Sequence, residues 1–463
     1  MPAQLHAMTA AELSAAFRSG ALSPVEVAGA VLARMAAWEP AINAMHIVDA
    51  EGAMAQARAA EGRWRAGAPL SPLDGVPITI KDNIATAGFT TPVGIAGDPG
   101  PAAAVDSPPA ARVREAGCVI LGKTTMPDMG MLASGMSSAH GITCNPWRLD
   151  RNTAGSSSGA GAALAAGYGP LALGTDIGGS VRLPAAYCGV IGHKPSLGRV
   201  PIHPPDWGRV TGPMTRTVLD AALLLTILAQ PDRRDWMSLP YQPVDYAQAL
   251  EQPLAGLRLG LMLEIGVGTP ATAEVRAAVT EAARLFVEAG AVVEEAPPFA
   301  DAAMLTGLAR YFQARACAVH LMLPPERREK LLPFVRDWLQ PAAGWSAMEA
   351  FQAIAQIGRI REAAAQACAP FDFVLTPTSP IPPYAADEPC PGSDLANPFG
   401  HVAFTAPFNQ SEQPACSVPC GTTADGLPIG LQIVGQRFDD LGVLQLAHAF
   451  ERLRGPLPSW PEP

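Results

Sequence analysis

Three side chains suited to nucleophilic catalysis stand in glycine-rich or apolar runs of the sequence: Ser156, Ser180 and Lys81. The serines lie within Gly155–Gly159 and Gly174–Ser180, and the lysine ends an apolar run. A serine hydroxyl is a weak nucleophile until a base takes its proton. Burial at a strand end can keep a lysine amine neutral and therefore basic. The pattern favours a serine nucleophile with a lysine base.

The glycines beside Ser180 predict a site for a developing oxyanion. Gly178 and Gly179 carry no side chain, so the backbone can turn and direct several N–H groups at one point. Such a nest stabilises negative charge on an oxygen. The nearest histidines, His140 and His193, form no obvious triad with these residues. Lysine therefore remains the favoured base.

Two short motifs match the sequence formally, but the elements predicted around them do not fit either motif. Residues 117–124, GCVILGKT, match a phosphate-binding loop, but such a loop needs a turn where Cys118–Leu121 predicts a buried strand. Residues 155–159 match the nucleophile elbow G-x-S-x-G with Ser157 at its centre. That elbow must follow a hydrophobic strand, and residues 149–153 are polar. We expect neither motif to function.

The elements around the two serines follow a loop, helix, strand, loop order. Residues 160–167 are rich in alanine and predict a helix, and residues 171–173 predict a short buried strand. Residues 75–81 predict the strand that ends at Lys81. Alternation of strands and helices is typical of an α/β core, and it would bring both serine loops to one edge of the sheet.

Three longer stretches carry a family resemblance: GVPITIKDN at 75–83, AGSSSG at 154–159 and GTDIGGSVRLPAAYCGVIGHKPS at 174–196. Together they resemble the amidase signature family, densely over residues 73–228 and again near 414–435. The resemblance implies a single α/β domain whose mixed, twisted central β-sheet is covered by helices on both faces. It also implies amide hydrolysis through a Ser–cis-Ser–Lys unit and a seryl acyl-enzyme, with no cofactor and no metal.

The resemblance assigns roles by motif position. Ser180 is the implied nucleophile, Ser156 the bridging serine with the cis peptide bond, and Lys81 the base. Ser157 is the implied hydrogen-bonding neighbour of Lys81. The oxyanion hole is implied at the backbone N–H groups of Ile177, Gly178, Gly179 and Ser180.

Further residues are expected to support the site or to line it. Asp176 and Arg182 are expected to pair and brace the nucleophile loop, with Arg182 as a ligand for a substrate carboxylate as the alternative. In relatives, the region that corresponds to residues 126–138 lies along the substrate. Met131, Ser134 and Met136 are therefore predicted to line the substrate site, and ordinary core packing is the alternative. Methionine makes such a surface soft and adaptable.

One position departs from the pattern of relatives, and another separates two functions. His193 stands where relatives carry an apolar residue, and we expect it to be packed and not a base. The glutamine-amidase subunit of tRNA-dependent amidotransferases carries S-L-D-Q-[IVA]-G-P, whereas residues 205–213 here read PDWGRVTGP. An independent amidase is therefore favoured over that subunit. A non-catalytic binding module is disfavoured because all three catalytic positions are present.

Composition limits the partners and the compartment. The chain has 463 residues, a formal charge of −10 and a pI near 5.3, which argues against nucleic acid or an anionic membrane as partner. No apolar run reaches the length of a membrane span. The N-terminus lacks signal-peptide features, and the eight cysteines form no CxxC pair or zinc set. These features predict a cytoplasmic enzyme with reduced thiols. The resemblance implies a small amide as substrate, which we expect to be uncharged and moderately hydrophobic, and it leaves the assembly open, a homodimer being one alternative.

The predicted organisation is one domain over residues 1–463. Residues 1–70 form a helical cover, with two capping boxes at Thr9–Glu12 and Ser23–Glu26. Residues 71–230 form the signature core. Residues 231–463 extend the sheet and supply a variable helical segment and the closing strands, with 324–341 expected near the active-site mouth.

Overall fold

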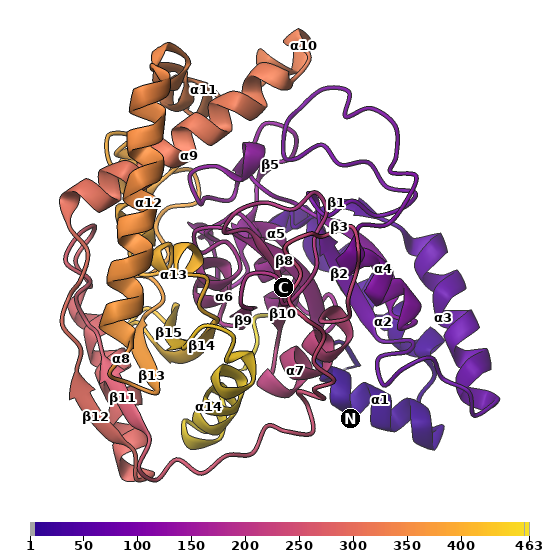
Figure 1. Cartoon of the computed structure of the whole chain (residues 1–463). Helices are drawn as coiled ribbons and strands as arrows, with labels where there is room; N and C mark the ends of the chain where they lie inside the picture. The colour runs from indigo at the N-terminus through magenta and orange to yellow at the C-terminus, as the bar shows by residue number, and fades with distance from the viewer. Residues whose placement is uncertain (1–4, 458, 463) are drawn as a thin grey trace.

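A single mixed sheet organises the computed structural model, which describes residues 5–457 and 459–462 (Figure 1). Within that part of the chain the sheet has eleven strands, and β2 runs parallel to β3 and β8 while β8, β10 and β9 pair antiparallel. The predicted α/β fold is thereby confirmed. In spatial order the strands are β1 (Met45–Val48), β3 (Val119–Thr124), β2 (Pro77–Lys81), β8 (Leu171–Asp176), β10 (Val210–Thr215), β9 (Ile191–Lys194), β14 (Ala415–Thr422), β15 (Pro428–Gly435), β13 (Phe373–Pro377), β11 (Arg258–Leu261) and β12 (Val292–Glu295).

Helices cover both faces of this sheet. Successive strand side chains point to opposite sides, so each face presents side chains that can pack against helices. On β14, Cys416 packs into the same apolar cluster as side chains of α8 (Ala273–Glu288) and α14 (Asp440–Leu453). Its neighbour Ala415 packs into another cluster with α12 (Ala347–Cys368) and α13 (Pro407–Gln410). The sheet is therefore buried on two sides, as α/β architecture requires.

The N-terminal segment is mostly helical, as predicted. Its helices are α1 (Ala10–Ser19), α2 (Pro24–Ile42) and α3 (Ala50–Arg65), and both predicted capping boxes are present, at Thr9 and Ser23. The sequence analysis missed β1, which pairs with β3 at the edge of the sheet. Its four residues carry too short a pattern to signal a strand.

The core segment places the strand ends that matter for chemistry. It contains α4 (Pro108–Glu115), α5 (Ser158–Ala166), α6 (Arg182–Cys188) and α7 (Val218–Leu228). Residues 119–124 of the phosphate-loop pattern form β3, and all six are buried, so the turn that such a loop needs between its glycines is absent. Residues 148–152 form strand β7, which pairs with β6 (Cys144–Asn145) outside the central sheet. A second small pair is β4 (Met136–Ser137) with β5 (Gly141–Ile142).

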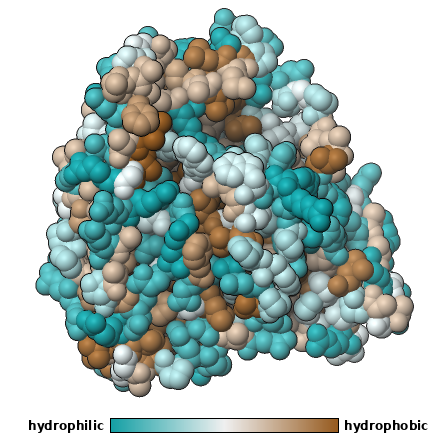
Figure 2. Space-filling model, viewed as in Figure 1, coloured by the Kyte–Doolittle hydropathy of each residue, from teal (hydrophilic) through white to brown (hydrophobic). Residues whose placement is uncertain are grey.

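Two long helices, α9 (Ala302–Met322) and α12, pack together beside the core (Figure 1). In the sequence, α10 (Pro325–Arg328) and α11 (Pro333–Leu339) lie between these two helices. Hydrophobic side chains gather at the top of Figure 2, over α11 and the adjoining ends of α9 and α12. Met322 of α9 and Phe351 of α12 are exposed. Arg327 of α10 donates to the backbone oxygens of Pro92 and Ile95, which ties this segment to the core.

Candidate active site

Lys81 is held at the end of β2, next to the end of the parallel strand β8. Its side chain is fully buried, and Nζ donates to Ser156 Oγ at 2.7 Å and to Thr175 Oγ1 at 2.9 Å. Burial lowers the pKa of Lys81 to about 7, although the charges of Asp176 and Asp82 act in the opposite direction. The amine is therefore poised to exchange a proton near neutral pH.

Ser156 follows β7 in a loop whose Gly155–Ser156 peptide bond is cis. The next residue, Ser157, makes no hydrogen bond to Lys81 within the described residues. Instead, its Oγ lies 3.3 Å from both the backbone N and the backbone O of Thr175. The expectation for Ser157 is corrected accordingly: the hydroxyl that accompanies Ser156 at the lysine belongs to Thr175.

Ser180 and Ser156 line one cavity of about 190 Å³. The backbone oxygen of Ser180 accepts the N–H of Ser157 at 3.1 Å, which ties the two serine loops together. Within the described residues, the two Oγ atoms of Ser156 and Ser180 share no hydrogen bond. Ser180 also borders a smaller hollow of about 30 Å³, whose walls include the apolar side chains of Met131, Leu183, Phe312, Phe399 and Val402.

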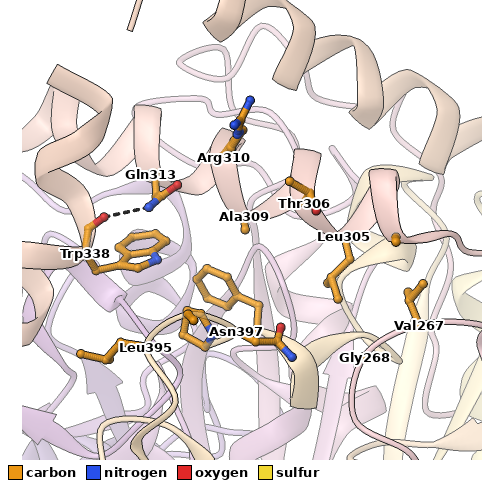
Figure 3. A pocket seen from close by; sticks show the side chains of 14 residues that line it. Val267, Gly268, Leu305, Thr306, Ala309, Arg310, Gln313, Trp338, Leu395 and Asn397 are labelled. Carbon is orange, nitrogen blue, oxygen red and sulfur yellow. Dashed lines mark hydrogen bonds between the residues drawn. The ribbon is translucent and has the colours of Figure 1, made fainter. Parts of the chain in front are cut away.

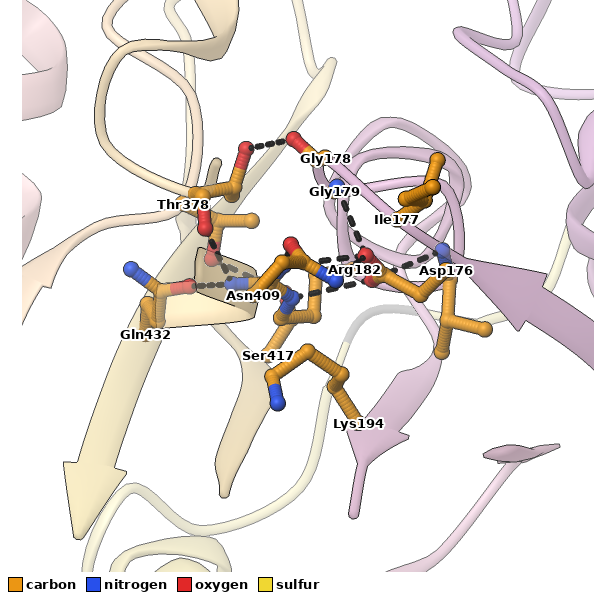
Figure 4. Close-up of polar contacts among 12 residues, drawn as sticks. Asp176, Ile177, Gly178, Gly179, Arg182, Lys194, Thr378, Asn409, Ser417 and Gln432 are labelled. Carbon is orange, nitrogen blue, oxygen red and sulfur yellow. Dashed lines mark hydrogen bonds and ion pairs between the residues drawn. The ribbon is translucent and has the colours of Figure 1, made fainter. Parts of the chain in front are cut away.

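Asp176 shapes the loop that carries the nucleophile candidate (Figure 4). Its carboxylate accepts the N–H groups of Gly179 at 2.7 Å and Val181 at 3.1 Å. Gly179 has a φ of +130°, and a Cβ there would lie 2.3 Å from Thr405 Oγ1, so only glycine fits. The same hydroxyl donates to the backbone oxygen of Gly178 at 2.7 Å. The loop that carries Ser180 is thus held by Asp176 and by Thr405.

Arg182 completes this brace and has no N–H group left for a ligand. Nε and Nη2 each lie 3.0 Å from the carboxylate of Asp176. The remaining N–H groups donate to the backbone oxygen of Thr405 and to side-chain oxygens of Gln432 and Asn409. Burial alone would raise the pKa of Asp176, but the Arg182 guanidinium outweighs it and holds that pKa well below its usual value. The geometry favours the bracing role over the carboxylate-anchor alternative.

The other predicted residues divide between the cavity and the core. Met131 lines the cavity, whereas Ser134 and Met136 are not among its lining residues and Ser134 is fully buried. His193 is also fully buried and lies 3.8 Å from Asp440, away from the cavity. Burial lowers its pKa, even with that carboxylate nearby. His193 is a packed side chain, as expected.

Sequence reasoning missed several residues that surround the site. Asn409 and Gln432 lie more than two hundred positions beyond Arg182. Arg209 and Arg315 line the cavity, although the sequence analysis assigned a role to neither. Among the missed residues, Thr175 alone could have been found from the sequence. It is a hydroxyl residue at a strand end next to Asp176, the place where polar side chains of parallel strands meet.

A larger pocket of about 720 Å³ lies beside α9 and does not include the candidate catalytic residues (Figure 3). Arg310 and Gln313 border it on one side, and Leu395 and Asn397 border it on the other. It shares Phe399 with the small apolar hollow at Ser180. That side chain therefore stands between the outer pocket and the active-site hollow.

Two features are absent from residues 5–457 and 459–462. None of the helices there combines the length and apolarity that crossing a bilayer demands. Across the same residues, histidine, cysteine, aspartate and glutamate do not gather in threes at a spacing suited to a metal ion.

The cavity brings two serines together at the edge of the sheet, and a buried lysine donates a hydrogen bond to one of them. Comparisons with known proteins show the family to which a chain with this fold and cavity belongs. The family model Amidase matches residues 26–444. The chain is 36% identical to one of the subunits of glutamyl-tRNA(Gln) amidotransferase from Symbiobacterium thermophilum, covering 96% of each chain. It is 34% identical to an acylamidase of Rhodococcus erythropolis, covering 97% of this chain and 96% of the relative.

A solved structure shares the whole fold. A bacterial aryl acylamidase of the amidase signature family superposes with a TM-score of 0.88 at 31% identity, over 96% of both chains. The chain belongs to the amidase signature family. It is an amide C–N hydrolase.

Proposed function

We propose that the protein hydrolyses a small carboxylic amide to an acid and ammonia or an amine through an acyl-enzyme on Ser180. Ser180 Oγ would attack the carbonyl carbon while its proton passes to Ser156, whose own proton passes to Lys81. The tetrahedral intermediate then breaks its C–N bond as the proton returns to the leaving nitrogen. Water cleaves the resulting ester by the same relay, which frees the acid and Ser180.

The observation that carries this proposal is the 2.7 Å hydrogen bond between Lys81 Nζ and Ser156 Oγ beneath the cavity. Two other buried lysines, Lys123 and Lys194, also have pKa values lowered by burial, to about 8 and about 7. Their Nζ atoms donate to backbone oxygens of Ile84 and Pro195 and contact neither serine. Contact with Ser156, more than burial, supports Lys81 as the base.

The oxyanion would be bound by backbone N–H groups of the loop before Ser180. The N–H of Gly179, one of the four expected donors, already donates to Asp176. The N–H groups of Ile177, Gly178 and Ser180 donate to no backbone or side-chain oxygen of the described residues. We assign these three as the donors, since oxyanion stabilisation needs N–H groups that are preorganised and free.

The test is to trap the acyl-enzyme and to identify the product. Incubation with a panel of aryl and alkyl amides should release free acid, detected by mass spectrometry. A sulfonyl fluoride should modify Ser180, mapped by peptide digestion. Modification of Ser157 instead, or full turnover by Ser180→Ala, would contradict the assignment.

A second candidate is a glutamine-amidase subunit that works with a partner protein. It is favoured by the 36% identity to an amidotransferase subunit. Residues 205–213, where that subunit carries the S-L-D-Q-[IVA]-G-P run, argue against it. Glutaminase activity together with co-purification of a partner protein would establish this candidate in place of the first.

We further propose a reducing compartment, the cytoplasm, as the place of action. Six of the eight cysteines are buried, namely Cys118, Cys188, Cys317, Cys368, Cys390 and Cys416. Buried thiols pack as small apolar side chains. Fractionation of the native host, followed by immunoblotting, tests this placement.

A further inference from the structure

Two arginines line the cavity that holds the serines, and they come from different parts of the fold. Arg209 immediately precedes β10, and Arg315 lies in the second half of α9. Both line the same 190 Å³ cavity as Ser156 and Ser180. Each side chain is about one quarter exposed, 25% for Arg209 and 26% for Arg315. Their charge is therefore partly desolvated but still accessible from the cavity.

The pair shares a single counter-charge. Arg209 Nε lies 3.6 Å from Asp206 Oδ2, and Arg315 Nη2 contacts the same oxygen. Arg209 Nη2 also donates to the backbone oxygen of Pro204 at 2.8 Å. Each guanidinium has five N–H donors, so most of those ten donors are left without a partner among the described residues.

The rest of the cavity offers no compensating negative charge. Its described lining contains the two arginines and neither aspartate nor glutamate. Burial lowers the pKa of Arg209 and of Arg315, which means that each charged form costs solvation. Arginine remains protonated under all ordinary conditions. An anion bound between the two guanidinium groups would relieve that cost, and a carboxylate matches their planar fork.

We propose that Arg209 and Arg315 bind a carboxylate of the substrate, so that the preferred substrate is an amide bearing an acidic group. This inference deepens the proposed amidase function and rests on it. The small hollow that also borders Ser180 is lined mainly by apolar side chains, which suits an uncharged part of the substrate. The substrate class is thus an amide with one apolar part and one carboxylate-bearing part, in place of the uncharged amide expected from the sequence.

Two matched pairs of amides test the proposal with the full-length protein. Hippurate and N-propylbenzamide carry or lack a carboxylate on the amine side, and succinamate and butanamide do so on the acyl side. In one pair the acidic member should have a kcat/KM about ten- to a hundredfold higher than its neutral counterpart, as charge-assisted hydrogen bonds confer. The pair that responds identifies which side of the amide faces the arginines.

Variants then connect the preference to these side chains. Arg209→Gln and Arg315→Gln should each raise KM for the acidic member about ten- to a hundredfold and leave KM for the neutral member unchanged. Arg310→Gln, on the same helix as Arg315 but facing the outer pocket, is the matched control and should change neither. An equal rise in KM for both members would overturn the proposal.

A binding measurement separates this inference from the proposed function. Calorimetry with Ser180→Ala, which cannot form the acyl-enzyme, compares the affinity of each acidic amide with that of its neutral partner. Tighter binding of an acidic member supports the carboxylate site even if the wild type turns over neither compound. Equal binding within both pairs overturns the site even if amide hydrolysis is established.

Discussion

The pKa of Lys81 leads to a quantitative prediction for the pH dependence of turnover. Burial lowers this pKa to about 7. At that value about one tenth of the lysine is neutral at pH 6 and about nine tenths at pH 8. If neutral Lys81 is the base, kcat/KM should rise about tenfold between these pH values and then level. An unperturbed lysine would be neutral in only about one molecule in 3,000 at pH 7.

The same burial should cost stability, and the sign follows from proton binding. The folded pKa lies below that of the unfolded chain, so the unfolded chain binds the proton more tightly between pH 7 and 10.5. The free energy of unfolding therefore rises with pH through this window, and the full penalty of about 5 kcal/mol applies below it. Lys81→Met removes the penalty but loses the hydrogen bonds to Ser156 and Thr175, worth about 1 kcal/mol each.

We therefore expect Lys81→Met to be inactive yet more stable than the wild type by about 3 kcal/mol at pH 6, measured by urea denaturation. Lys123→Met is the matched control, since Lys123 is buried on β3 and contacts neither serine. It should keep turnover and its rise with pH. Near-wild-type turnover by Lys81→Met would refute the reasoning, and loss of turnover in His193→Ala alone would indicate a histidine base.

Three further outcomes follow from the site. Ser180→Ala should lose on the order of 10³ to 10⁶ in kcat, measured with the amide on which the wild type is most active; a smaller loss would mean another nucleophile. Arg182→Ala should lower the free energy of unfolding by about 3–5 kcal/mol in a denaturant titration, because it leaves Asp176 buried without its ion pair; an unchanged midpoint would show that the pair is not a brace. Thr175→Val should lower kcat about tenfold, because Lys81 loses a hydrogen bond that orients it; unchanged kinetics would show that Ser156 alone positions the lysine.

The local part of the site could be predicted from the sequence. Lys81 was expected at the end of an apolar strand, and the two serine loops were expected around a short helix and strand, where the structure has them. Asp176 and Arg182 were expected to pair, and they do. Each of these statements depends on residues within one or two neighbouring elements. Over such distances, strand alternation, glycine content and helix capping constrain the backbone directly.

The rest of the site required the tertiary structure. Thr175 meets Lys81 because β2 and β8 are adjacent parallel strands, although the two residues are 94 positions apart. Asn409 and Gln432 reach Arg182 from 227 and 250 positions away. Contacts of that range leave no periodicity in the sequence, because they depend on which strands become neighbours in the sheet.

The residues that line the cavity also divide into those that the sequence indicated and those that only the tertiary structure brings there. The sequence by itself predicted the proposed chemistry, because a nucleophile, a relay serine and a base must be particular residue types on particular turns. For the charge of the substrate the sequence supports only the expectation of an uncharged amide, whereas the acidic amide that we propose rests on the folded cavity. Arg209 and Arg315 come from separate segments and share a cavity only after α9 packs against the core. Packing of distant elements decides which side chains face a substrate, and only the folded chain specifies that packing.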